Sequence, residues 1–477
     1  MKERFFSHQY KLLLGLVLLA GFFIRAVNLN FNSPFLDEAI YINLGRQFWS
    51  GNWSSLSESI SWVGGFPFFY PPLAAAFFAF GGIVTSRFLN VILGVASAYL
   101  IYKFTYELFP IEDKKQRLLA GIIAAALMAT SAIPIVYSRQ TMLDNLSIFL
   151  FLAGSLFLAR AIYEGERDSY IRSAISLFGA FLAKYIAVIY IPLLLILTLY
   201  LATRTGKKYI LEGIFKSFWL PLVLLTLVFV SINFESLTGF FASKTSGHSG
   251  SFFGIIWSYL KYSPLIFAAS VPSIYFIIKK KATGLALILS LGALLPLFAH
   301  ITIGEGSSVH QHSVFALLFL LPTIGIASGS LINKYKYPAV LAIGLFIFLN
   351  FIISMPKVKA LETFWPNTNE AVKFLRSDVV PGDQVLAESE DSIALGLSNK
   401  LPQENIEGPF DFTYRNLKGV DAYQSAVNDG YFNYIELDKT FFSSDEYLAI
   451  ESVIEKNYSL VFDDGSIRIL KIKNEKI

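Results

Sequence analysis

The chain has 477 residues, with 39 Lys and Arg against 35 Asp and Glu, 54% hydrophobic residues and only 16% charged residues. Charged residues make up about a quarter of an ordinary globular chain, so this deficit, with a mean hydropathy of +0.54, excludes a single soluble domain and indicates a polytopic membrane protein. Because there is no cysteine, disulfides, thiolate zinc sites, iron–sulfur clusters and a cysteine nucleophile are excluded as well.

Hydrophobic runs predict about eleven transmembrane helices, since a span needs ~20 mostly apolar residues. The runs fall at 12–26, 87–107, 118–136, 146–163, 171–183, 186–203, 217–233, 253–278, 283–300, 313–332 and 337–354. No small-residue cleavage site follows the first run, so we expect a retained helix rather than a signal peptide. The run 72–84 is too short to cross alone and is predicted to be interfacial or re-entrant.

The distribution of basic residues predicts the orientation of these spans. With the N-terminus in the cytoplasm, 19 Lys and Arg fall in segments that lie inside, and 7 fall in the outside segments of the membrane part. Cytoplasmic loops of membrane proteins have this excess. We therefore expect a multi-pass cell-membrane protein whose C-terminal part lies outside the cell.

The composition changes after residue 354 and divides the chain. Residues 1–354 have 26 basic and 14 acidic residues and are predicted to form the transmembrane domain, with a long first exterior loop at 28–86. Residues 355–477 have 13 basic and 21 acidic residues and are predicted to form a soluble exterior α/β domain. Its signals are helices near 367–376 and 443–456, strands at 384–387 and 431–437, and a hairpin turn at Asp464-Gly465. The basic excess is an orientation signal, so no nucleic-acid partner is expected.

Charged residues at the exterior ends of the spans are the candidate functional residues, because ionisable groups at membrane depth are costly. In the first exterior loop, Asp37 and Glu38 follow Pro34 and are predicted to occupy the first turn of a short helix. An acidic helix cap without further function is the alternative.

Two further exterior sites have the same character. Arg139 and Asp144 lie between the third and fourth spans, where a structural ion pair is the alternative. Lys184 lies alone between two long apolar runs, where a snorkelling lysine is the alternative.

Four ionisable residues share one exterior loop: His300, Glu305, His310 and His312. They could ligate zinc, donate to a phosphate, or be solvated loop residues. A divalent metal is therefore an open hypothesis, with candidate ligands Asp37, Asp144, His300, Glu305, His310 and His312. The sequence has no Walker loop, dinucleotide fingerprint or His-Glu-x-x-His motif, so no nucleotide cofactor is expected.

These residues suit the transfer of a sugar from a lipid phosphate. A carboxylate must take the proton of the acceptor, and cations must stabilise the departing phosphate. Asp37 suits the first role. The cations for the second role are Arg87, Arg139 and Lys184, with His310 and His312 as further phosphate-binding candidates.

The order of these motifs resembles that of the membrane glycosyltransferases of the C-type fold. Within that group it is similar to the branch of the protein O-mannosyltransferases and the lipid A aminoarabinose transferase. The motifs are Pro34-Phe-Leu-Asp37-Glu38-Ala-Ile-Tyr41, Tyr70-Pro71-Pro72-Leu73, Ser86-Arg87, Tyr137-Ser-Arg139-x4-Asp144 and Lys184.

The resemblance implies a polyprenyl-phosphate sugar donor, transfer on the exterior face and inversion at the anomeric carbon. It implies that Asp37 is the catalytic acid or base, with Glu38 beside it and Asp144 as the second acid, and that Arg87 and Lys184 lie near the donor phosphate. The sugar would be a hexose or a pentose, and the acceptor a hydroxyl of a lipid, glycan or protein.

The chain departs from the branch at Pro71, where relatives of the aminoarabinose type have a lysine, and its exterior domain is more similar to the α/β cap of prokaryotic members. A transporter or flippase for a lipid-linked sugar is the alternative function, because it would need the same cations but no base.

Overall fold

The computed structural model describes residues 2–108, 113–164, 166–205, 208–245, 250–410 and 412–473. It divides into two compact units. The helical unit consists of Met1–Leu29 and Gly45–Leu361, and the α/β unit consists of Asn30–Leu44 and Glu362–Ile477. Each unit has its own core, and each is described by itself.

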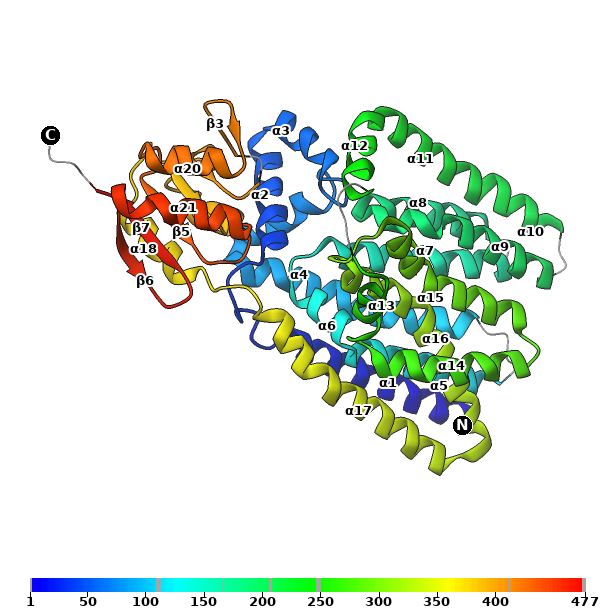
Figure 1. The fold of residues 1–477 in the computed structure, drawn as a ribbon. Helices are drawn as coiled ribbons and strands as arrows, with labels where there is room; N and C mark the ends of the chain where they lie inside the picture. Colours follow the sequence, from blue (N-terminus) through cyan, green and yellow to red (C-terminus); the bar gives the residue numbers. More distant parts are fainter. Residues whose placement is uncertain are drawn as a thin grey trace. The chain divides into compact units, whose positions relative to one another are not determined.

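The helical unit contains most of the helices of the protein (Figure 1). They are α1 (Lys2–Ala26), α2 (Leu36–Ser50, which enters this unit at Gly45), α3 (Trp53–Glu58), η1 (Ser59–Ser61), α4 (Tyr70–Leu108), α5 (Lys114–Thr130), α6 (Ala132–Arg139), α7 (Leu143–Glu164), α8 (Arg167–Ala183), η2 (Tyr185–Tyr190), α9 (Ile191–Thr205), α10 (Lys208–Gly213), the π-helical η3 (Ile214–Trp219), α11 (Leu220–Ile232), α12 (Phe234–Thr245), α13 (Phe252–Leu260), α14 (Pro264–Lys279), α15 (Thr283–Ile303), α16 (Val309–Tyr335) and α17 (Tyr337–Glu362).

Helix α16 lies at the centre of this unit and packs against α5, α14 and α15. Of its 18-residue apolar stretch 89% is buried, against 11% for α1 and 17% for α17. The two outer helices therefore expose apolar side chains, as helices that face lipid do.

By length and composition, seven of the described helices could each cross a membrane, or up to nine spans if two bent helix pairs each count as one. The sequence predicts about eleven. The difference lies at 171–183 and 186–203, which form α8 and α9 with 17 and 15 residues. Both are shorter than the ~20 residues of a typical span.

Helix α4 reverses its direction at Gly81-Gly82. Gly82 has φ 69°, a conformation that glycine adopts readily. Beyond the turn, the Ser86 hydroxyl donates to the carbonyl of Ala74 (3.0 Å) and the Asn90 amide donates to the Tyr70 hydroxyl (2.6 Å). Residues 70 and 90 would be about 30 Å apart in a straight helix. The segment 72–84 therefore turns back on the following limb, and its placement in the membrane as an interfacial or re-entrant segment stays a prediction.

The α/β unit is built on a five-stranded mixed sheet with the order β2-β1-β5-β7-β6. Strand β1 is parallel to β2 and β5, whereas β7 is antiparallel to β5 and β6. The strands are β1 (Val385–Ala387), β2 (Ile406–Glu407), β5 (Tyr434–Leu437), β6 (Tyr458–Asp463) and β7 (Arg468–Ile472), with a separate hairpin of β3 (Thr413–Tyr414) and β4 (Leu417–Lys418). The helices are α18 (Asn369–Asp378), α19 (Glu390–Leu397), η4 (Gln403–Asn405), α20 (Val420–Asn428) and α21 (Ser444–Asn457). The predicted α/β class and the predicted turn at Asp464-Gly465 are confirmed.

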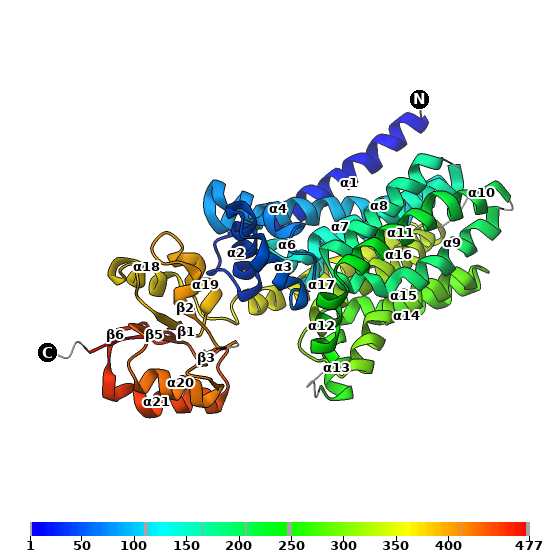
Figure 2. The same ribbon diagram turned by 90° about the horizontal axis from the view of Figure 1, so that it is seen from above.

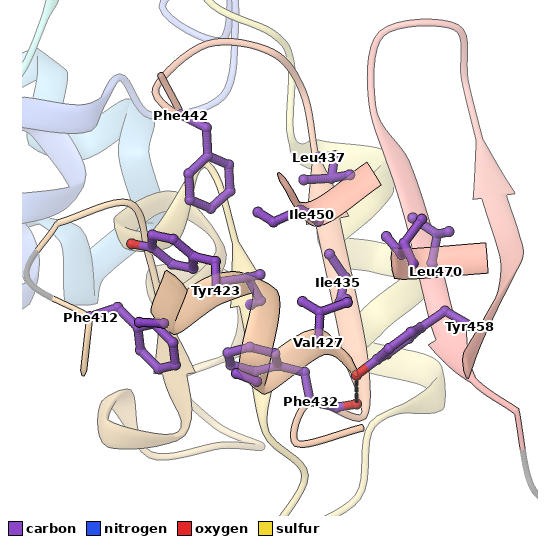
Figure 3. Close-up of a cluster of buried hydrophobic side chains, with 14 residues drawn as sticks. Phe412, Tyr423, Val427, Phe432, Ile435, Leu437, Phe442, Ile450, Tyr458 and Leu470 are labelled. Carbon is purple, nitrogen blue, oxygen red and sulfur yellow. Dashed lines mark hydrogen bonds between the residues drawn. The ribbon is translucent and has the colours of Figure 1, made fainter. Parts of the chain in front are cut away.

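Helices cover both faces of this sheet (Figure 2). Because successive strand residues point to opposite faces, Leu386 packs with α20 and α21 while Val385 and Ala387 pack with α18 and α19. Figure 3 shows the first of these cores, where the Tyr458 hydroxyl donates to the carbonyl of Phe432 at 2.9 Å.

Hydrogen bonds join the segment 30–35 to residues 365–368, at the start of the C-terminal part of the α/β unit. The Asn32 amide donates to the carbonyl of Trp365 (3.1 Å), the Trp365 indole donates to the carbonyl of Ser33 (3.2 Å), and the Thr368 amide donates to the Ser33 hydroxyl (3.0 Å). The Phe35 ring lies 5.0 Å from the Trp365 ring between centroids. The loop that precedes Asp37 thus folds with residues more than 300 positions later in the chain.

Candidate functional site

Asp37 and Glu38 occupy the first turn of α2, as predicted, and differ in their surroundings. The Glu38 side chain is fully buried, and its Oε2 accepts a hydrogen bond from the backbone N–H of Phe35 at 2.9 Å. Asp37 is only half-buried. The positive end of the helix favours both charges. The acidic-cap interpretation therefore describes Glu38, whereas Asp37 is only partly buried.

The first turn of α19 lies beside this end of α2. Asp391, in the first turn of α19, accepts a hydrogen bond at its backbone carbonyl from the Asn43 amide (3.1 Å), and the next residue, Ser392, donates to the carbonyl of Pro34 (2.8 Å). Asp391 is absent from the predicted site. Its only sequence signal is a pair of acids after a short strand, which by itself indicates no more than a helix start.

Arg87 lies on the second limb of α4 and is fully buried. Its Nη1 donates to the carbonyl of Leu29 at 2.7 Å, immediately beyond α1. This contact ties α4 to the segment that follows α1. The role of Arg87 at a donor phosphate stays a prediction.

Arg139 donates to the backbone at the end of α1. Its Nη1 lies 3.1 Å from the carbonyl oxygen of Ile24, 3.0 Å from that of Arg25 and 2.7 Å from that of Val27, and its Nη2 lies 3.2 Å from that of Asn28. The last carbonyls of a helix have no partner within the helix. These contacts make Arg139 a cap of α1, and they account for its position without a phosphate.

Asp144 and Lys184 form a buried ion pair. The Lys184 Nζ lies 2.6 Å from Asp144 Oδ1, and both side chains are buried. Oδ2 of Asp144 has no hydrogen-bond partner among the described residues. A buried acceptor without a donor is costly, so this oxygen is available to a donor group of a ligand.

A backbone pairing with residues 64–66 fixes the position of Lys184. Lys184 is extended (φ −153°, ψ 121°) between α8 and η2. On either side of it, the N–H of Phe66 donates to the carbonyl of Leu182 (2.7 Å) and the N–H of Tyr185 donates to the carbonyl of Gly64 (2.8 Å). Between these bonds, a Cβ on Gly65 would lie 2.3 Å from the carbonyl oxygen of Ala183. Only glycine permits this approach.

Polar side chains that the prediction did not include join α4 to the start of α7. The Asn145 amide donates to the side-chain oxygen of Asn90 (3.1 Å) and to the carbonyl of Tyr137, and the Thr141 hydroxyl donates to the Ser86 hydroxyl (3.1 Å). Asparagine within an apolar run is the sequence signal for such a contact between helices.

His300 and His312 form a hydrogen-bonded chain with Glu305. His300 Nδ1 lies 2.8 Å from Glu305 Oε2, and His300 Nε2 lies 2.8 Å from His312 Nδ1. Burial raises the pKa of Glu305, but hydrogen bonds from His300, Ser307 and Ser308 outweigh it and hold the pKa well below its usual range. His300 and Glu305 are buried, so the solvated-loop interpretation does not describe them.

His310 lies near the ion pair of Asp144 and Lys184. Its ring stands 6.5 Å from the Tyr137 ring and 5.7 Å from the Tyr262 ring between centroids. Lys184 and Asp144 are near enough to act on it electrostatically. The helical unit therefore gathers His310 with two of the predicted site residues.

These groups bear on the open hypothesis of a divalent metal. Within the part of the chain that the structure describes, no group of three or more histidine, aspartate and glutamate side chains could hold a metal ion. Both ring nitrogens of His300 face Glu305 and His312, which leaves neither nitrogen for a metal.

The predicted site residues thus fall in two units. Asp37 and Glu38 belong to the α/β unit, and the remaining candidates belong to the helical unit: Arg87, Arg139, Asp144, Lys184, His300, Glu305, His310 and His312.

Comparison with known proteins gives matches to solved structures. No protein-family model and no curated protein sequence matches the chain. The structure of ArnT from Cupriavidus metallidurans in the apo state superposes with a TM-score of 0.65 at 13% identity, over 97% of this chain and 98% of that chain. The Archaeoglobus fulgidus oligosaccharyltransferase superposes with a TM-score of 0.56 at 14% identity, over 96% of this chain and 72% of that chain.

The mycobacterial arabinofuranosyltransferase AftD superposes with a TM-score of 0.52 at 12% identity, over 98% of this chain and 42% of that chain. All three are glycosyltransferases of the C-type fold. At these identities the likeness concerns the fold, which runs through nearly the whole chain. The fold that the loop motifs predicted is confirmed: the protein has the C-type glycosyltransferase fold of a polytopic membrane protein.

Proposed function

We propose that the protein is an inverting glycosyltransferase that moves a sugar from a polyprenyl phosphate to a hydroxyl acceptor on the exterior face of the membrane. The observation that supports this most directly is the match in fold, over 97% of the chain, to ArnT, which has also been solved with undecaprenyl phosphate bound. The Archaeoglobus fulgidus oligosaccharyltransferase has been solved with a dolichol-phosphate and an inhibitory peptide. A lipid-phosphate sugar is accordingly the donor class that we infer.

The chemistry that we assign to Asp37 is general-base catalysis. Its carboxylate takes the proton of the acceptor hydroxyl while the hydroxyl oxygen forms a bond to the anomeric carbon. The bond from that carbon to the phosphate oxygen breaks, and its electron pair leaves with the phosphate. A single displacement inverts the anomeric configuration. Glu38, which caps α2, holds Asp37 at the helix end.

We assign the helical-unit residues to the donor. The positive charge of Lys184 stabilises the departing phosphate. Oδ2 of Asp144, which has no hydrogen-bond partner among the described residues, accepts a hydrogen bond from a sugar hydroxyl. Arg87 and His310 are further phosphate-binding candidates, and His312 is a weaker one because its Nδ1 is used by His300. The sugar and the acceptor depend on the shape of the pocket.

The test uses the purified protein with a radiolabelled polyprenyl-phosphate sugar and an acceptor extract. We expect Asp37→Asn to abolish transfer while donor binding changes less than twofold, because the substitution removes the base but not the cations. Glu404→Gln, on η4, is a charge-matched control that should transfer normally. If Asp37→Asn transferred sugar at the wild-type rate, the catalytic role would be wrong. Donor binding by the wild type without transfer to any acceptor would favour the transporter or flippase.

A further inference from the structure

The α/β unit brings the first turn of α19, which contains Asp391, next to the start of α2, which contains Asp37. The Ser392 hydroxyl donates to the carbonyl of Pro34 (2.8 Å), and the Asn43 amide donates to the carbonyl of Asp391 (3.1 Å). Pro34 and Asn43 lie on either side of Asp37 in the sequence. Asp391 and Ser392, two successive residues of α19, are therefore hydrogen-bonded to residues that precede and follow Asp37.

The Asp391 side chain lies on the side of α19 that meets α2. The Asn43 amide donates to the Asp391 backbone carbonyl at 3.1 Å and is near enough to the carboxyl to lower its pKa. The neighbouring acid, Glu390, lies against Gly408. A Cβ added to Gly408 would be 2.0 Å from Glu390 Oε2. Consecutive acids thus lie against different elements, and Asp391 is the one beside α2.

We propose that Asp391 is a positioning residue for Asp37: held by Asn43 at the first turn of α19, its carboxyl lies beside the Asp37 carboxylate and keeps that carboxylate a strong enough base to deprotonate the acceptor. The proposal rests on the proposed function, in which Asp37 is the base. It gives the α/β unit a part in catalysis, through Asp391, besides its contribution to the loop that precedes Asp37.

The charges around Asp391 agree with this arrangement. Burial raises the pKa of Asp391, the hydrogen bond from Asn43 lowers it, and the charge of Asp37 raises it further, with a net rise. The acids on the neighbouring elements are Glu390 on α19 and Glu407 on β2, and the pKa of Glu390 is also raised, first by burial and then by Asp391 and Glu407. Like charges that share a site disfavour each other's ionisation. Ionisation of Asp391 near neutral pH therefore makes Asp37 a stronger base.

Two measurements on the full chain in detergent test the proposal. The first is thermal unfolding of the wild type, Asp37→Asn, Asp391→Asn and the double variant at pH 8. Because the folded state favours the protonated form of Asp391, its contribution to stability falls as pH rises above the ordinary aspartate range. We expect each single substitution to raise the unfolding midpoint, and the double variant to rise by less than the sum. Additive shifts would show that the two carboxyls do not interact and would overturn the proposal.

The second measurement is the pH profile of transfer. We expect Asp391→Asn to move the acidic limb of kcat/KM to lower pH by about one unit and to lower the plateau rate, whereas Asp391→Glu restores the wild-type limb. Glu407→Gln, the matched control, should leave the limb in place. An unshifted limb in Asp391→Asn, with transfer still abolished in Asp37→Asn, would overturn this proposal and leave the proposed function standing. Absence of transfer by the wild type, with sub-additive midpoints, would instead overturn the proposed function.

Discussion

At the scale of single residues, neighbouring acids in this protein have different surroundings and therefore different roles. Glu38 is buried and caps its own helix, whereas Asp37, one position earlier, is half-buried at the same helix end. Asp144 is buried with one oxygen on Lys184 and the other without a partner among the described residues. Burial and hydrogen bonding therefore decide which carboxylate is structural and which is available for chemistry.

The Asp144–Lys184 pair leads to a prediction that separates stability from function. Lys184→Ala leaves a buried carboxylate without its partner, so we expect a loss of about 3–5 kcal/mol in the free energy of unfolding. The measurement is unfolding in detergent. Donor affinity, measured on the folded fraction, should weaken more than twofold.

The control for this prediction is the double variant Asp144→Leu/Lys184→Met, which replaces the pair by apolar groups. Such replacements are often neutral in stability. We expect the stability to recover while the donor affinity stays weak. Wild-type donor affinity in the double variant would show that the pair is only structural.

At the scale of elements, backbone contacts between distant segments position the site. Arg139 caps α1 through carbonyls at its end, and the turn at Gly81-Gly82 folds α4 into a hairpin. The extended break between α8 and η2 pairs with residues 64–66. Each of these contacts involves groups that regular secondary structure leaves without partners.

The pairing beside Lys184 predicts that Gly65→Ala lowers transfer. The added methyl group would lie 2.3 Å from the carbonyl oxygen of Ala183, so the loop that holds Lys184 must move. Small displacements of catalytic groups cost roughly a hundredfold in rate, and we expect a loss of ten- to a hundredfold in kcat/KM. The control is Gly64→Ala, where a Cβ meets no atom within 4 Å and the rate should stay within twofold. Equal rates for the two variants would contradict the proposed placement of Lys184.

At the scale of the whole molecule, the chain combines a helical unit with an α/β unit that also contains Asn30–Leu44. The acidic loop is thus built from both ends of the chain. Asn32 and Ser33 bond to Trp365 and Thr368, so the C-terminal unit contributes to the position of Asp37.

The orientation of the chain is predicted by its basic residues and can be tested directly, because there is no native cysteine to remove. We expect Lys400→Cys, on the exposed surface of the α/β unit, to react with a membrane-impermeant maleimide on intact cells. Lys115→Cys, exposed at the start of α5, should react only after the cells are permeabilised. The opposite pattern would contradict an exterior C-terminal unit.

The sequence by itself determined the features that depend on local composition and pattern. Apolar runs predicted the helical class, alternation and turn residues predicted the small α/β region, and the order of loop motifs from Asp37 to Lys184 predicted the C-type fold. It also selected Asp37, Asp144 and Lys184 as residues of interest, because charges beside apolar runs are conspicuous.

Only the tertiary structure decided how those residues are partnered. It pairs Asp144 with Lys184, assigns Arg139 to the end of α1, and places Asp391 beside the turn of Asp37. Asp391 and Asp37 are separated by 354 positions in the chain, and contacts over such distances leave no local periodicity to detect. The physical reason is that a buried polar group takes whichever partner the packing of helices brings to it, and that packing is a property of the whole fold.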